Sequence, residues 1–233
     1  MNLLEVKDLH IRYGSFEAVK GVSFALGKGE ILGIVGESGS GKSTIAKTLM
    51  GLEQASAGTI AIQTVRPGKV ALQMIFQDAV GSLNPRMTTR QTLKEVVKFT
   101  NSPFAVDQLL ETVGLSPAVL DQYPREMSGG QCQRVSIARA LACNPEVLIA
   151  DEPVSALDVS VQARILNLLR DLRKKLGLSI LLIAHDLAVV KNVCDRICVM
   201  EHGRFVDEGD AEDVFAYPTS EYTRRLLSAV PRI

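Results

Sequence analysis

Residues 30–44 read EILGIVGESGSGKST, and this stretch decides the fold. Its first half is nearly all apolar, as expected of a central strand that is covered on both faces. Its second half fits the pattern G-x-x-x-x-G-K-[ST], and helical spacing follows it. Glycines let the backbone curl so that successive N–H groups point into one hollow, and the helix start adds partial positive charge. This stretch therefore predicts a phosphate-binding loop, in which Lys42 reaches the β- and γ-phosphates and the Ser43 hydroxyl binds Mg²⁺.

Strands and helices alternate around this loop. The apolar segments 146–151 and 179–186 read as buried parallel strands, and the helical pattern 159–177 separates them. Such alternation predicts an α/β core with a mostly parallel sheet. By contrast, residues 78–142 show only loops and helical periodicity, which predicts a helical insertion.

Shorter signals complete the expected order of elements. Residues 3–13 alternate apolar and polar positions, residues 21–30 read as a short strand, and residues 58–77 read as two strands around a turn at residues 66–68. A last strand pair turns at His202 and Gly203, and a helix is expected over residues 220–230.

Composition limits the classes of function. The chain has 233 residues, of which 46% are hydrophobic and 22% charged, so it forms a sizeable core as one large domain or one domain with an insertion. Its formal net charge is zero, whereas duplex nucleic-acid binders usually carry a basic excess. No apolar run is long enough to cross a bilayer, and no signal-peptide layout is present, so we expect a cytosolic chain that is free to sit on a membrane protein. The spacing of the four cysteines matches no metal site, and we expect them to be small buried side chains.

An acidic pair follows the predicted strand 146–151. Asp151 and Glu152 would lie beyond the carboxyl end of that strand, where open parallel sheets bind ligands. Phosphoryl transfer needs a cation across the β- and γ-oxygens and a positioned nucleophile. We expect Asp151 to hold Mg²⁺ through a water and Glu152 to orient or deprotonate the attacking water. A turn or a helix cap is the alternative interpretation of the same pair.

A second glycine motif opens the segment EMSGGQCQRVSIARALA at residues 126–142. Ser128 offers a hydroxyl, Gly129 and Gly130 permit close backbone approach, and the helix from about Gln131 has its positive end here. This segment too has the pattern of a helix start that binds phosphate. The chain therefore has two such patterns, since residues 36–43 already form one.

Taken together, these segments resemble the nucleotide-binding subunit of an ATP-binding cassette (ABC) transporter over essentially the whole chain. GESGSGKST resembles the family's Walker A, and VLIADE resembles its Walker B with the catalytic glutamate that follows. MSGGQ resembles the family's signature, and SALD at residues 155–158 resembles its D-loop. Gln77 matches the Q-loop glutamine, His185 the switch histidine, and Tyr13 the aromatic residue that stacks on adenine, although Phe16 is near. Met127 departs from the usual leucine, and the two side chains are close in volume.

The resemblance implies the ABC ATPase fold: a P-loop NTPase core with a mostly parallel sheet, an antiparallel β subdomain and a helical insertion. Residues 1–233 would form a single nucleotide-binding domain, with the core in 1–77 and 143–233 and the helical subdomain in 78–142. The catalytic residues would be Glu152, His185 and Gln77. Mg²⁺ would be held by Ser43, Gln77 and Asp151. ATP would contact Tyr13, Gly36, Ser38, Gly39, Gly41, Lys42, Ser43, Thr44, Ser128, Gly129, Gly130, Gln131 and Asp158.

The resemblance also implies partners. Two cassettes would pair head to tail, so that Walker A of one and the signature of the other hold the same ATP. Segments such as FQDAVGSLNPRMT resemble the oligopeptide, dipeptide and nickel importer branch. In that branch a non-identical second ATPase, two transmembrane permease subunits and an extracytoplasmic substrate-binding protein complete the transporter. The cargo would be peptides, nickel or chelated metal, and the chain would be peripheral to the cytoplasmic face of the inner membrane.

Three other functions share part of this pattern: a soluble cassette ATPase acting on DNA or ribosomes without a transporter, an unrelated phosphate-loop kinase or GTPase, and a non-hydrolysing partner subunit. The missing basic stripe disfavours the first, MSGGQ and SALD have no use in the second, and Glu152 with His185 argues against the third.

Overall fold

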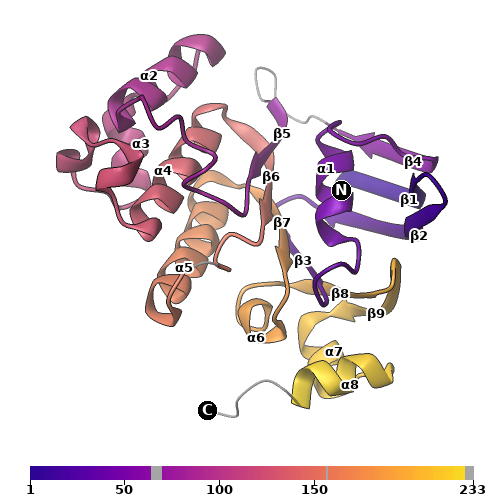
Figure 1. The fold of residues 1–233 in the computed structure, drawn as a ribbon. Coiled ribbons are helices and arrows are strands. Elements are labelled where there is room, and N and C mark those ends of the chain that lie inside the picture. The colour runs from indigo at the N-terminus through magenta and orange to yellow at the C-terminus, as the bar shows by residue number, and fades with distance from the viewer. Residues whose placement is uncertain (64–69, 156, 229–233) are drawn as a thin grey trace.

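The computed structural model describes residues 1–63, 70–155 and 157–228 (Figure 1). The strands are β1 (Asn2–Tyr13), β2 (Phe16–Gly27), β3 (Ile31–Val35), β4 (Ala57–Ile62), β5 (Val70–Ile75), β6 (Pro145–Asp151), β7 (Ser179–Ala184), β8 (Arg196–Glu201) and β9 (Arg204–Asp210). The helices are α1 (Lys42–Leu49), α2 (Thr89–Thr100), α3 (Val106–Thr112), α4 (Gly129–Ala142), α5 (Val159–Leu176), α6 (Leu187–Val190), α7 (Ala211–Ala216) and α8 (Glu221–Ser228), with 3₁₀ turns η1 (Pro117–Asp121) and η2 (Pro124–Glu126).

The larger sheet has six strands in the order β5-β6-β7-β3-β8-β9. The first five run parallel to one another, and β9 pairs antiparallel with β8 through the turn at His202 and Gly203. Strand β3 lies between β7 and β8, and all five of its residues are buried. The mostly parallel α/β core that the sequence predicts is thus confirmed, with the strand of residues 31–35 inside it.

The two faces of this sheet carry different helices. Along β6, Leu148 and Ala150 pack in a cluster with α4 and α5, whereas Val147 and Ile149 pack in a cluster with α1 and the antiparallel sheet. This alternation is the two-residue period of a strand that is covered on both sides. Figure 1 likewise shows α1 and α4 on opposite sides of the sheet. The two glycine motifs therefore open helices on opposite faces.

The smaller sheet is antiparallel, with three strands in the order β2-β1-β4. Strand β2 begins at Phe16, earlier than the alternation from Gly21 suggests. The two strands predicted in residues 58–77 do not pair with each other: β4 joins β1, and β5 joins β6 in the parallel sheet. A local turn signal cannot show which sheet each flanking strand enters, and the expected turn at residues 66–68 lies outside the described residues.

Residues 78–142 form α2, α3, the two 3₁₀ turns and α4, in agreement with their helical periodicity. Leu93 of α2 and Leu110 of α3 are buried in the same cluster as Ile137 of α4, so these helices share one core. The short helices α6 and α7 were not predicted, since four and six residues are too few for a clear period. The expected helix at 220–230 is α8, and its last two predicted residues lie outside the described part. None of the described helices is long and apolar enough to cross a membrane.

Candidate functional site

The loop between β3 and α1 takes the shape that the glycine pattern predicts. Gly41 is the N-cap of α1, with φ of 112°, and a Cβ there would lie 2.6 Å from the Ala18 carbonyl oxygen. Both facts exclude a larger residue. No side chain caps the start of α1, so its first-turn N–H groups face the loop without one. Gly36 is buried, Ser38 and Gly39 are exposed on the loop, and Thr44 is half-buried in the first turn.

Lys42 extends back into this loop. Its side chain is only 3% exposed, and Nζ donates hydrogen bonds to the carbonyl oxygens of Gly36 at 2.7 Å and Glu37 at 2.8 Å. Burial lowers the pKa of Lys42, and the nearby carboxylates of Glu152 and Asp151 oppose that effect. A buried ammonium whose partners are neutral carbonyls is suited to bind a phosphate.

Asp151 ends β6 beside the phosphate loop. The Ser43 hydroxyl donates to its Oδ1 at 2.9 Å, although 108 residues separate the two in the chain. Asp151 is 5% exposed, and burial raises its pKa, while the hydrogen bond from Ser43 acts in the opposite direction. A hydroxyl and a buried carboxylate side by side are the hard oxygen ligands that Mg²⁺ prefers.

Three other side chains meet next to this pair. Glu152 accepts a hydrogen bond from Gln77 Nε2 at 2.9 Å, and its Oε2 lies 3.8 Å from His185 Nδ1. Gln77 follows β5, Glu152 follows β6 and His185 follows β7, so the carboxyl ends of three adjacent strands supply the group. Glu152 also has φ of 45°, a left-handed conformation that is uncommon for a residue with a side chain.

The second glycine motif starts α4 as a capping box. Ser128 is the N-cap, its hydroxyl accepts from the Gln131 N–H, and the Gln131 side chain accepts from the Ser128 N–H. The helix begins at Gly129, two residues before the predicted start. A Cβ on Gly129 would lie 3.3 Å from a methyl group of Leu157, and one on Gly130 would lie 2.7 Å from Cγ1 of Val161. Packing within this chain is thus a second reason for glycine here.

Met127 has a specific contact in place of the usual leucine. The Thr89 hydroxyl at the start of α2 lies 3.5 Å from the Met127 sulfur, in hydrogen-bond geometry. The thioether is a weak acceptor that leucine lacks, so this departure ties the signature segment to α2.

The two remaining predicted contact residues, Asp158 and Tyr13, lie at the ends of other elements. Asp158 is the N-cap of α5: its carboxylate accepts from the Val161 N–H at 3.0 Å and the Ser160 hydroxyl at 2.8 Å. Ala156, inside the expected D-loop, is outside the described residues. Tyr13 ends β1 and is 44% exposed, and Phe16, opposite it across the turn, is 63% exposed. Both aromatic rings are therefore available for adenine.

The structure gathers the phosphate loop, Asp151, Glu152, Gln77 and His185 at one edge of the parallel sheet. It keeps Ser128 to Gln131 on α4, on the face of the sheet opposite to α1. Helix α4 reaches β6 through a two-residue connection, so its amino end points toward the same edge of the sheet. The predicted residues thus fall into two separate groups in this chain.

Several contacts to the site had no local sequence signal. The Gly203 N–H donates to the Ser40 carbonyl at 3.0 Å, and the Tyr222 hydroxyl accepts from the Glu37 N–H at 2.8 Å. Arg139 of α4 donates to the Ser82 carbonyl, in the segment that follows Gln77. These pairs join residues 57 to 185 positions apart, so no motif spacing reveals them.

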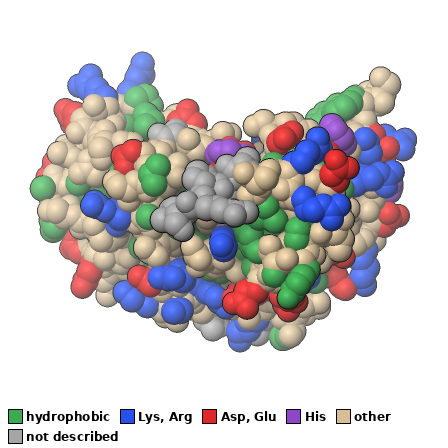
Figure 2. Space-filling view, turned by 90° about the horizontal axis from the view of Figure 1, so that it is seen from below, with side chains coloured by type: hydrophobic (Ala, Val, Ile, Leu, Met, Phe, Trp, Pro, Cys, Tyr) green, Lys and Arg blue, Asp and Glu red, His purple; other side chains and the backbone are tan. Residues whose placement is uncertain are grey.

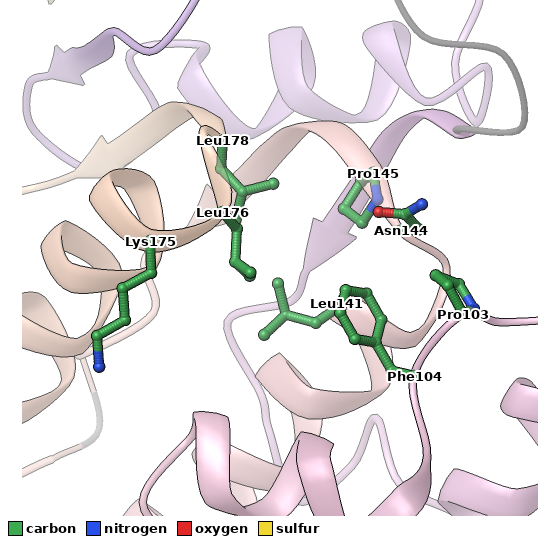
Figure 3. Close-up of a pocket in the computed structure, with 8 residues that line it drawn as sticks. All are labelled: Pro103, Phe104, Leu141, Asn144, Pro145, Lys175, Leu176 and Leu178. Carbon is green, nitrogen blue, oxygen red and sulfur yellow. The ribbon is translucent and has the colours of Figure 1, made fainter.

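An apolar hollow of about 360 Å³ lies elsewhere, between Leu141, Phe104 and Leu178 (Figure 3). Pro145, which also lines it, begins β6, whereas Asp151 ends that strand. The hollow is therefore at the opposite end of the strand from the phosphate loop, and it has no part in the site.

Known proteins are similar to this chain in both sequence and fold. A family model described as ABC transporter matches residues 19–155. The oligopeptide transport ATP-binding protein OppF of Lactococcus lactis subsp. lactis (strain IL1403) is 45% identical over 99% of this chain and 81% of its own. The protein of the same name from Escherichia coli (strain K12) is 43% identical, over 98% of this chain and 78% of its own.

Solved structures give the same result. The cbiO1 protein from Clostridium perfringens, part of the ABC transporter complex cbiONQ, has a TM-score of 0.81 at 28% identity and covers 99% of this chain and 96% of its own. The ATP-binding cassette MJ0796, as a post-hydrolysis dimer bound to ADP and Pi, has a TM-score of 0.76 at 26% identity and covers 89% of this chain and 98% of its own. With this fold, this phosphate loop and these relatives, the chain belongs to the ABC transporter family, as a subunit that binds and hydrolyses ATP.

Proposed function

We propose that the chain powers an importer of oligopeptides and acts by closing with a second cassette over shared ATP. The observation that carries the proposal is the convergence of Lys42, Ser43, Asp151 and Glu152 at one edge of the parallel sheet. The relatives named OppF, aligned over nearly the whole chain, favour peptides among the expected cargoes over nickel or chelated metal.

Nucleotide binding would rest on the phosphate loop. The N–H groups around Gly41 and Lys42 face the phosphates, and Thr44 lies in the same first helical turn. Lys42 exchanges its two carbonyl partners for phosphate oxygens, which are stronger acceptors because they are charged. Tyr13 or Phe16 stacks on adenine from the exposed turn of the antiparallel sheet.

The residues present fit a magnesium ion that arrives with ATP. Ser43 and Asp151 already touch, and the buried Asp151 carboxylate carries a charge that a cation would balance. Together with Gln77 they would hold the ion, which, when bound, neutralises charge on the β- and γ-phosphates.

Hydrolysis would depend on Glu152. In the structure its carboxylate is engaged by Gln77 and approached by His185, and its side chain is 10% exposed. We infer that Gln77 moves from Glu152 to the nucleotide site when ATP binds. The freed carboxylate then orients or deprotonates the attacking water, and His185 donates a hydrogen bond to the γ-phosphate.

The second group of predicted residues, at the start of α4, would explain why one chain has two glycine motifs. Because α1 and α4 cover opposite faces of the sheet, we infer that the Ser128 motif serves ATP held by a partner cassette. Ser128 and the N–H groups of Gly129, Gly130 and Gln131 would then meet the partner's γ-phosphate. Asp158, besides capping α5, would contact the partner. We propose that the partner cassette is a different chain, because the sequence resembles the importer branch, in which the two ATPase subunits differ.

The membrane partners would dock near the Gln77 segment. Leu83, in the segment after Gln77, is 3% exposed and Leu93 of α2 is fully buried, so neither side chain is open to a permease. Phe76 and Val80, at 38% and 49% exposed, are the apolar side chains that a permease helix would cover. The chain would thus sit at the cytoplasmic face of the membrane, on two permease subunits that receive cargo from an external binding protein.

A soluble ATPase acting on nucleic acid is the weaker candidate. Basic and acidic side chains are interspersed over the face shown in Figure 2, where such a partner would need a basic stripe. The proposal is tested by reconstituting the chain with its co-purifying membrane subunits in liposomes. We expect ATP hydrolysis to rise when a peptide-loaded binding protein is added. Hydrolysis that instead responds to DNA or ribosomes would overturn the proposal.

A further inference from the structure

The hydroxyl of Tyr222 reaches the phosphate loop from the last described helix. Tyr222 lies in α8, is 4% exposed and packs in the core cluster of the α4 face. Its hydroxyl oxygen accepts the Glu37 N–H at 2.8 Å, across 185 residues of chain. Burial raises the pKa of Tyr222, so the side chain keeps its proton at neutral pH.

This hydrogen bond fixes the peptide unit that holds Lys42. The Glu37 N–H and the Gly36 carbonyl belong to the same peptide, and that carbonyl accepts from Lys42 Nζ at 2.7 Å. A trans peptide is planar, with its N–H and C=O pointing in opposite directions, and the described chain has no cis peptide. Holding the N–H on Tyr222 therefore aims the carbonyl at the lysine.

Helix α8 is itself anchored in a way that suits this role. The Asp207 carboxylate of β9 accepts from the backbone N–H of Thr219 at 3.1 Å and of Ser220 at 3.0 Å, and also from the Thr219 hydroxyl. Burial acts to raise the pKa of Asp207, but these hydrogen bonds outweigh it and the pKa is lowered. The start of α8 is thus bound to the sheet that carries the phosphate loop. Figure 1 shows α7 and α8 below β8 and β9, beside that sheet.

We propose that Tyr222 is a positioning residue for ATP binding, which orients the Gly36–Glu37 peptide and through it Lys42. The proposal rests on the assignment of the phosphate loop to ATP made above. It adds α8 to the elements that determine nucleotide affinity, although α8 is far from the loop in the sequence.

The test replaces Tyr222 with phenylalanine, which keeps the buried ring and removes only the hydroxyl that accepts the Glu37 N–H. In the full chain, the dissociation constant of a fluorescent ATP analogue should rise about three- to tenfold, the range expected for one net hydrogen bond. The KM for ATP should rise by the same factor, while kcat at saturating ATP stays within about twofold of the unmodified chain. Tyr217→Phe is the matched control, because Tyr217 precedes α8 and is 80% exposed, and it should leave both constants unchanged.

Two further results separate the possible failures. If Tyr222→Phe binds the analogue as tightly as the unmodified chain, or lowers only the melting temperature without nucleotide, the positioning role is wrong. Lys42→Ala is measured alongside and should weaken binding more than Tyr222→Phe does. Unchanged binding in Lys42→Ala would refute the site assignment itself, and with it the premise of the proposal.

Discussion

Glu152 is the residue where the local structure and the proposed chemistry meet most closely. Its left-handed backbone is held by a hydrogen bond from its N–H to the Ile183 carbonyl at 3.0 Å, and its side chain points into the group formed with Gln77 and His185. Such backbone strain persists only where the surroundings hold it, and it is concentrated at functional sites. We infer that this conformation aims the carboxylate.

Replacing Glu152 with glutamine should lower ATP hydrolysis at least about a hundredfold, because an oriented catalytic group contributes roughly 3 kcal/mol to the transition state. ATP binding should survive, since Lys42 and the loop are unchanged. Single-turnover hydrolysis and equilibrium binding measure the two effects, and Glu111→Gln, on the exposed side of α3, is the control. Near-normal turnover would show that another group activates the water.

The buried carboxylate of Asp151 should lower the stability of the fold, although the proposed function needs it. Its pKa is raised in the folded state, so its ionised form destabilises the fold above that pKa, and stability is regained as the pH falls through it. Asp151→Asn should therefore raise the melting temperature of the nucleotide-free chain by about 2–4 °C at neutral pH while hydrolysis is lost. Calorimetry at several pH values should show the difference shrinking toward acid pH. A variant that melts lower than the unmodified chain at neutral pH would contradict this reading.

At the scale of elements, α4 and α5 are fitted to each other at their amino ends. Gly130 faces Val161 so closely that a Cβ would lie 2.7 Å from Cγ1, and Asp158 caps α5 one turn before Val161. Packing between α4 and α5 within this chain therefore also requires a glycine at position 130.

Gly130→Ala should destabilise the nucleotide-free chain by about 1–2 kcal/mol, because overpacking outweighs the better helix propensity of alanine. Val161→Ala in the same chain should remove most of that loss. Urea unfolding of the single and double variants measures the coupling. If Gly130→Ala alone is neutral or stabilising, the glycine is there for the nucleotide and not for the packing.

Asp158→Ala should lower the melting temperature of the nucleotide-free chain by about 2–4 °C through loss of the helix cap. Asp158→Ser keeps a capping hydroxyl and should restore most of it. The same two variants separate the cap from the proposed contact with the partner. If both variants melt at the temperature of the unmodified chain but neither forms a dimer with the partner cassette, the contact with the partner is the dominant role of Asp158.

At the scale of the whole molecule, the sequence predicts what is local and misses what is distant. The strand, loop and helix around Lys42 follow from adjacent residues, and Asp151 is found beside Ser43 because parallel strands end at one edge. The separation of β4 from β5 and the hydrogen bond from the Glu37 N–H to Tyr222 depend on pairings between distant segments. The helix cap that Asp158 forms on α5 was not predicted either, because the resemblance to the D-loop indicates only a contact with ATP for this residue.

The proposed function depends above all on the closure of two cassettes over each ATP. The most direct measurement is the structure of the Glu152→Gln transporter trapped with ATP and Mg²⁺. We expect the Ser128 hydroxyl and the Gly130 N–H of this chain to lie within hydrogen-bond distance of the γ-phosphate of an ATP that is bound to the partner cassette's phosphate loop. A trapped assembly in which both groups of α4 lie remote from every nucleotide would contradict it.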